Sequence, residues 1–168
     1  MSTITKDKVY EWLASVTDPE VPVLTILDLG IVRDVVLQED EQGHVIATVV
    51  ITPTYSGCPA MDVIGINIRM ALLSRGIKKV NIDMQLSPAW TTDWMSEEGK
   101  RKLRAYGIAP PKRRATDNPL ALFEEEGVAC PRCGSTHTAL VSQFGPTSCK
   151  SLYKCEDCKE PFEHFKCH

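Results

Sequence analysis

The chain has 168 residues, of which 43% are hydrophobic, and a formal net charge of −3 at pH 7. These values are typical of a folded globular chain with one ordinary core and a small additional domain, and they exclude general disorder. The sequence lacks both a signal peptide and the ~18 consecutive apolar residues of a membrane span, so we expect a cytoplasmic protein. A net negative charge also argues against bulk nucleic-acid binding.

The first predicted element is an amphipathic helix over residues 6–16, with apolar side chains every three or four positions and Thr5 as its N-cap. The next segment, residues 18–22, contains two prolines. Neither proline can donate a backbone hydrogen bond, so the helix ends before them. A loop that carries Asp18 and Glu20 follows.

Three strands and two more helices are predicted downstream. Segments 31–38 and 45–52 are rich in β-branched residues and flank a polar turn, which predicts an antiparallel hairpin. A long apolar helix ending near Arg75 leads to an alternating strand over 80–86, and this right-handed crossover pairs the third strand parallel to an earlier one. A further helix is expected over 93–106. The fold class is therefore α+β, with a small mixed three-stranded sheet.

Cys58 lies where the second predicted strand leads into the long helix. We expect Cys58 at the helix N-cap and Pro59 at the first helical position, where unpaired amides and the helix dipole favour the thiolate. If the two neighbouring loops fold together, they form one open pocket of oxygen and sulfur ligands suited to transient iron. The alternative is that Cys58 is a buried small side chain and Asp18 a turn cap. The candidate ligands are Cys58, Asp18, Glu20 and Thr54.

Two Cys-x-x-Cys pairs stand near the C-terminal end, separated by 21 residues. Such pairs are typical of a four-cysteine zinc site, because each pair curls so that both sulfurs face one point. The separation slightly exceeds the usual range, and the intervening hairpin can absorb the difference. The odd total of seven cysteines favours metal-bound thiolates over disulfides. The predicted zinc ligands are Cys130, Cys133, Cys155 and Cys158.

Three other residues of the tail are potential ligands. Any of Cys149, Cys167 and His168 could replace one of the four cysteines, although the paired spacing favours the pairs. Cys149 is then either an inert packing residue or a second functional thiol, whose pKa the neighbouring Lys150 would lower.

The sequence divides into two domains and a linker. Prolines and charge blocks without periodicity predict a linker over residues 109–127. Residues 1–108 then form the α+β domain. Residues 128–168 form the zinc ribbon.

The motifs of the first domain resemble a known family. Segments 18–22 and 26–30, together with Thr52–Thr54 and Cys58–Pro59, are similar to the hallmarks of the iron–sulfur cluster assembly domain of cytosolic iron–sulfur targeting factors and their bacterial relatives. The resemblance covers about residues 5–108 and implies the fold of that family.

Three further segments make the resemblance more specific. Residues 87–94, 106–111 and the tail from 130 to 155 resemble the D component, also called J, of the phenylacetyl-CoA epoxidase system. This system is a multicomponent di-iron oxygenase of aerobic phenylacetate degradation that forms the ring 1,2-epoxide of phenylacetyl-CoA. The resemblance implies an accessory or maturation component that belongs to the ring-hydroxylating complex.

The resemblance leads to a hypothesis about function. The protein would deliver or repair iron or iron–sulfur centres of the oxygenase and reductase subunits, with Cys58 as a transient ligand and Asp18 and Glu20 as acidic neighbours. A non-catalytic role agrees with the sequence, because no Glu-x-x-His pair lies on a predicted helix and no dinucleotide glycine motif occurs. A homodimer is compatible with the sequence, and no membrane partner is expected. The alternative is a zinc-ribbon adaptor that binds protein or nucleic acid and transfers no metal.

Overall fold

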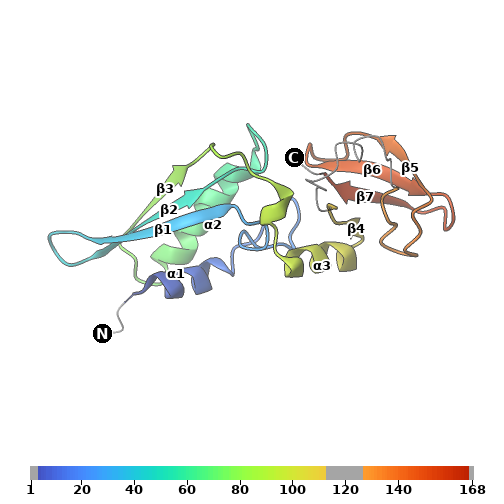
Figure 1. The fold of residues 1–168 in the computed structure, drawn as a ribbon. Helices are drawn as coiled ribbons and strands as arrows, with labels where there is room; N and C mark the ends of the chain where they lie inside the picture. The colour runs from blue at the N-terminus through green and yellow to red at the C-terminus, as the bar shows by residue number, and fades with distance from the viewer. Residues whose placement is uncertain (1–3, 113–126, 167–168) are drawn as a thin grey trace. The chain divides into compact units, whose positions relative to one another are not determined.

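A computed structural model describes residues 4–112 and 127–166 (Figure 1). The chain separates into two compact units. The N-terminal unit comprises Met1–Trp90 and Trp94–Ser96, and the C-terminal unit comprises Thr91–Asp93 and Glu97–His168. None of the helices in the described ranges combines the length and the apolar content needed to cross a lipid bilayer.

The N-terminal unit contains the mixed three-stranded sheet that the sequence predicts. The strand order is β1-β2-β3, with β1 and β2 antiparallel and β2 and β3 parallel. Helix α2 forms the crossover between the parallel strands (Figure 1). In chain order the elements are α1 (Lys6–Leu13), β1 (Val32–Glu39), β2 (Val45–Ile51), α2 (Ala60–Leu73) and β3 (Lys79–Met84).

Helix α1 begins as predicted and ends earlier. The side chain of Thr5 accepts a hydrogen bond from the backbone N of Lys8, which confirms the N-cap. The predicted end at Val16 is wrong, because the backbone of Val16 has other partners. Its N–H donates to Leu13 O, and its carbonyl accepts from Ile26 N at 3.0 Å. The chain therefore leaves the helix to pair with the loop that follows.

The core of the N-terminal unit lies between the sheet and the helices. Alternate residues of β2, Ala47, Val49 and Ile51, are fully buried, as expected for the central strand of a sheet. Helix α2 contacts both β3 and α1. Its buried side consists of Ala60, Met61, Ile64, Gly65, Ile68 and Leu72.

Asp28 joins the loop before β1 to the segment before α3. Its Oδ2 accepts from Thr25 N at 3.0 Å and its Oδ1 accepts from Ser96 Oγ at 3.0 Å. The backbone N–H of Ser96 donates to Asp28 O at 2.9 Å. The predicted helix over 93–106 is therefore wrong in its first turn: a 3-10 turn over Thr92–Trp94 precedes α3 (Glu97–Tyr106), because both polar groups of Ser96 bond to Asp28.

The C-terminal unit is built on a four-stranded sheet in the order β4-β7-β6-β5. Strands β4 and β7 are parallel, and the other neighbours are antiparallel. A small core of Ala109, Val128, Cys130, Cys155 and Phe162 stabilises the sheet. Its elements are α3, β4 (Ile108–Ala109), β5 (Thr138–Ser142), β6 (Lys150–Cys155) and β7 (Pro161–Phe165).

The division of the chain differs from the predicted boundary at residue 108. Ile108 pairs with Glu163 and Ala109 pairs with His164, so the start of the predicted 109–127 linker is a strand of the C-terminal sheet. Helix α3 also belongs to this unit. A strand of two residues is too short to give a periodic signal, which is why sequence reasoning missed it. Residues 113–126 of the predicted linker lie outside the described residues.

Candidate metal centre

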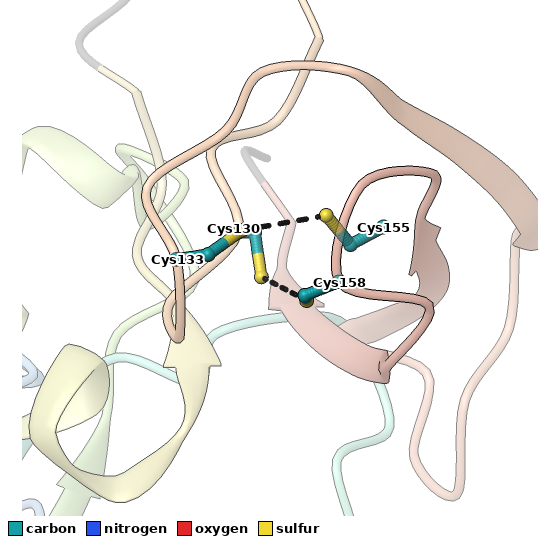
Figure 2. A group of neighbouring side chains, drawn as sticks. All are labelled: Cys130, Cys133, Cys155 and Cys158. Atoms are coloured by element: carbon teal, nitrogen blue, oxygen red, sulfur yellow. Dashed lines mark hydrogen bonds between the residues drawn. The ribbon is translucent and has the colours of Figure 1, made fainter.

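The four predicted zinc ligands converge on one point. Their sulfur atoms all lie within 4.8 Å of one another (Figure 2). The Sγ atoms of Cys130 and Cys158 are 3.7 Å apart, and those of Cys133 and Cys155 are 3.5 Å apart. Zinc bound tetrahedrally at about 2.3 Å from each sulfur requires sulfur pairs about 3.8 Å apart. The four residues therefore fit a structural metal ion of this kind.

The backbone of each Cys-x-x-Cys pair forms a tight turn. Cys130 N donates to Ser135 O at 2.8 Å, and Cys155 N donates to Glu160 O at 3.0 Å. The residue after each pair has a positive φ: +77° at Gly134 and +64° at Lys159. The two pairs thus have the same local geometry, and the second achieves it without a glycine.

Side chains outside the cysteines connect the two turns. Asp157 accepts hydrogen bonds from Ser135 Oγ and, at 3.1 Å, pairs with His137 Nδ1. Both partners lower the pKa of the Asp157 carboxyl, and the hydrogen bond from Ser135 has the larger effect. Arg132 forms an ion pair with Glu160 at 2.7 Å. These contacts hold the cysteine pairs side by side.

The pKa values of the thiols indicate why a cation is needed. Backbone N–H groups of Cys158 and Asp157 stabilise the Cys155 thiolate and lower its pKa to about 7. The backbone N–H of Glu160 favours a thiolate at Cys158, yet desolvation and the neighbouring thiols outweigh it and raise the pKa of Cys158 to about 12. Four adjacent thiolates repel one another, so all four ionise together only when a cation neutralises them.

The other candidate ligands of the tail are not part of this group. Cys149 is 4% exposed, and its Sγ lies 3.1 Å from Thr147 Oγ1. The four-cysteine group does not include it. The interpretation of Cys149 as a packing residue fits this environment better than that of a reactive thiol. Cys167 and His168 lie outside the described residues.

Cys58 lies in the loop that leads from β2 into α2. It is half-buried and forms no disulfide. The predicted N-cap position is wrong by one residue, because Pro59 is the N-cap and α2 begins at Ala60. Cys58 instead belongs to a turn before the helix: its N–H donates to Tyr55 O at 3.2 Å, and its carbonyl accepts from Met61 N at 3.3 Å.

The three predicted oxygen ligands near Cys58 lie in loops of the N-terminal unit. Asp18 Oδ1 accepts from the backbone N atoms of Glu20 and Val21, both at 2.8 Å, so Asp18 caps its turn as the alternative interpretation held. Thr54 is half-buried in the bend after β2. Within residues 4–112 and 127–166, the four cysteines are the one group of three or more ligand side chains close enough to share a metal. A pocket around Cys58 remains a prediction.

Thr52 is a polar residue of this region that the sequence analysis named only as part of the Thr52–Thr54 motif. It follows β2 directly, is 1% exposed, and its backbone N donates to Ile31 O at 2.8 Å. Its Oγ1 is buried and has no hydrogen-bond partner within the described part of the chain.

His164 makes the C-terminal unit sensitive to acid. Burial and then the charge of Lys112 lower its pKa from 6.5 to about 4. The unfolded chain therefore binds a proton between pH 6.5 and 4 that the folded unit excludes, and stability falls as pH falls through this window. We expect a loss of about 3 kcal/mol over the whole window, of which about 2 kcal/mol is lost by pH 5. Thermal unfolding of the zinc-loaded protein at pH 7 and pH 5, followed by circular dichroism, measures it.

The matched variant for this test is His164→Phe, which keeps a ring beside Tyr153 and removes the titrating group. Acid also releases zinc from thiolates, and that loss is common to both proteins. The difference in pH dependence between the wild type and His164→Phe therefore measures the contribution of His164. Equal pH dependence of the two proteins would contradict the role of His164.

Two family models match the chain. One, described as an iron-sulfur cluster assembly protein, covers residues 6–84, and the other, the PaaD zinc beta ribbon domain, covers residues 114–166. A protein of Escherichia coli K12, named as the putative D component of 1,2-phenylacetyl-CoA epoxidase, is 47% identical over 170 residues, which cover 99% of this chain and 98% of that protein. The chain belongs to the PaaD family. The resemblance stated from the motifs is thereby confirmed.

The N-terminal part of this PaaD family member also has shorter relatives. An Fe-S protein maturation auxiliary factor of Porphyromonas gingivalis is 40% identical over 100 residues, covering 59% of the chain and 90% of that protein. The crystal structure of a domain of unknown function from Bacillus anthracis aligns with a TM-score of 0.51 and 29% identity, over 58% of the chain and 90% of that domain. The family thus joins an iron–sulfur assembly domain to a zinc ribbon, and the predicted fold class is confirmed.

Proposed function

We propose that this protein is an accessory factor of the phenylacetyl-CoA epoxidase system that delivers or repairs iron or iron–sulfur centres of its oxygenase or reductase components. The observation that carries the proposal is the environment of Cys58, a half-exposed free thiol at the start of α2 with no complete ligand set around it among the described residues. The names of the relatives, an epoxidase component and iron–sulfur maturation factors, support the same role.

The chemistry of Cys58 suits a carrier of iron. Cys58 lies two residues before the first residue of α2, and a cysteine sulfur is a ligand that iron accepts. A site with one sulfur and few oxygens binds metal weakly, so the cargo can exchange onto the richer ligand set of a client. Asp18, Glu20 and Thr54 are the proposed oxygen donors, and Asp18 would supply its second oxygen, Oδ2, because Oδ1 accepts two backbone hydrogen bonds.

The four-cysteine site has a separate and structural role in this proposal. Cys130, Cys133, Cys155 and Cys158 would hold zinc, which supplies a redox-inert crosslink between the two turns. Two of these cysteines, Cys130 and Cys155, belong to the small core of the unit. Because all four ligands come from the protein, the site has no open position for a substrate, which separates it from iron transfer.

The experiment is a transfer assay with the full-length, zinc-loaded protein. The protein is loaded with ferrous iron or a cluster without oxygen and mixed with apo-reductase, and the absorbance and electron-transfer activity of the reductase are followed. We expect Cys58→Ala to slow transfer at least about tenfold. Loss of a residue that only orients a metal ligand already weakens metal binding by about this factor, and loss of the ligand itself should weaken it at least as much. Cys149→Ala is the matched control, because it removes a thiol outside both sites.

A second variant separates the charge of Asp18 from its role as a turn cap. Asp18→Asn keeps the oxygen that accepts from Glu20 N and Val21 N and removes the negative charge. Slower transfer with unchanged thermal stability supports a ligand role. Normal transfer by Cys58→Ala, or a wild-type protein that binds zinc and no iron even with the reductase present, refutes the carrier function and favours the adaptor.

A further inference from the structure

Helix α2 exposes a row of large apolar side chains on its outer side. Val63, Ile66, Met70 and Leu73 are 44%, 53%, 65% and 47% exposed. Their spacings of three and four residues place them within an arc of about 80°, since successive residues turn by about 100°. The same geometry places this row, the α2 stripe, directly opposite the buried side of the helix.

A helix with apolar residues on both sides is normally covered on both sides. Single exposed apolar residues need no explanation, but a continuous row of four along one helix marks an interaction surface. The two sides of α2 therefore require different partners. The inner side packs on its own sheet, and the α2 stripe lacks a partner within the described residues.

Charged residues along one edge of the α2 stripe indicate what the partner is. Asp62 and Arg69 are both exposed and lie seven residues apart, which is two helical turns or about 10.5 Å. Neither forms an ion pair with any residue that the structure describes. The opposite edge carries uncharged polar side chains, Asn67 and Ser74. One edge thus presents two opposite charges at a fixed spacing.

We infer that the α2 stripe is a homodimer interface, in which α2 packs antiparallel against α2 of a second copy of this chain about a two-fold axis near Ile66. A two-fold axis brings the same edges of both helices together. Asp62 of each copy then lies beside Arg69 of the other, so the dimer gains two ion pairs while the apolar side chains interdigitate. A parallel pairing about a two-fold axis would instead bring opposite edges together and leave both charges beside the uncharged edge. This inference does not rest on iron transfer.

Sedimentation equilibrium of the full-length zinc-loaded protein tests the interface. We expect a reversible dimer whose dissociation constant rises at least about 30-fold in Ile66→Glu, because a charge replaces a central apolar contact. Leu86→Glu is the matched control: Leu86 is 63% exposed and lies outside α2, so its variant should dimerise like the wild type. A monomer at all concentrations, or a dimer unchanged by Ile66→Glu, overturns the inference.

Charge reversal tests the antiparallel arrangement itself. Asp62→Arg alone and Arg69→Asp alone should each weaken the dimer about tenfold, since each creates two like-charge contacts. The double variant restores both pairs with exchanged signs and should return to the wild-type dissociation constant. All substituted positions are exposed, so folding is preserved and circular dichroism verifies it. Failure of the double variant to restore the dimer overturns the two-fold arrangement.

Discussion

Replacement of Cys155 by serine should unfold the C-terminal unit even when zinc is in excess. Cys155 is fully buried and belongs both to the four-sulfur group and to a small cluster of five buried core residues in the described part of the chain. Structural zinc contributes about 10–16 kcal/mol to the folding of small domains. A hydroxyl oxygen is a poor zinc ligand at neutral pH, so the variant loses most of this free energy. The remaining core cannot replace it.

The positions of the tryptophans allow the two units to be followed separately. The chain contains three tryptophans, and all of them, Trp12, Trp90 and Trp94, belong to the N-terminal unit. For Cys155→Ser, or for the wild type after strong chelation, we expect a loss of strand signal in circular dichroism with native tryptophan fluorescence. Cys149→Ser is the control for a buried cysteine outside the four-sulfur group, and it should retain one zinc. Native circular dichroism of Cys155→Ser with full zinc content would contradict the ligand assignment.

The parts of the fold that the sequence predicted are those set by local patterns. Alternation along 45–51 and the apolar period of α2 depend on neighbours close in the chain, so the hairpin and the crossover could be anticipated. The grouping of the four cysteines could be anticipated for the same reason, since each pair fixes its own geometry over four residues. The end of α1 could not be predicted, because Val16 pairs with Ile26, and the start of α3 depends on Ser96 and Asp28.

The region around Cys58 shows the limit of the same reasoning. Two loops far apart in the sequence carry its candidate ligands, and a side chain in such a loop can have a local use as well as a proposed functional one. Asp18 caps its own turn, which a local pattern also predicts, so the sequence alone could not separate the two roles. The burial of the Thr52 hydroxyl gave no signal in the sequence, because it becomes visible only once the fold surrounds the residue.

Gly30→Ala should destabilise the N-terminal unit by at least about 3 kcal/mol. Gly30 has a φ of +68°, where a side chain is strained. A Cβ at this position would lie 2.8 Å from the carbonyl carbon of Trp94, and closer still to its oxygen. Relief of the clash would require moving the segment that Ser96 ties to Asp28. Urea denaturation followed by tryptophan fluorescence measures the change, because all three tryptophans report on this unit.

Gly43→Ala separates the two causes of this loss. Gly43 has a similar φ of +76° in the turn between β1 and β2, but an added Cβ there meets nothing within 4 Å. This variant therefore carries the conformational cost alone, about 1 kcal/mol. The additional loss of unfolding free energy in Gly30→Ala, compared with Gly43→Ala, then measures how firmly the Trp94 segment is held against the loop before β1. If both glycines cost the same, that segment moves freely, and the hydrogen bonds between Asp28 and Ser96 do not fix the start of α3.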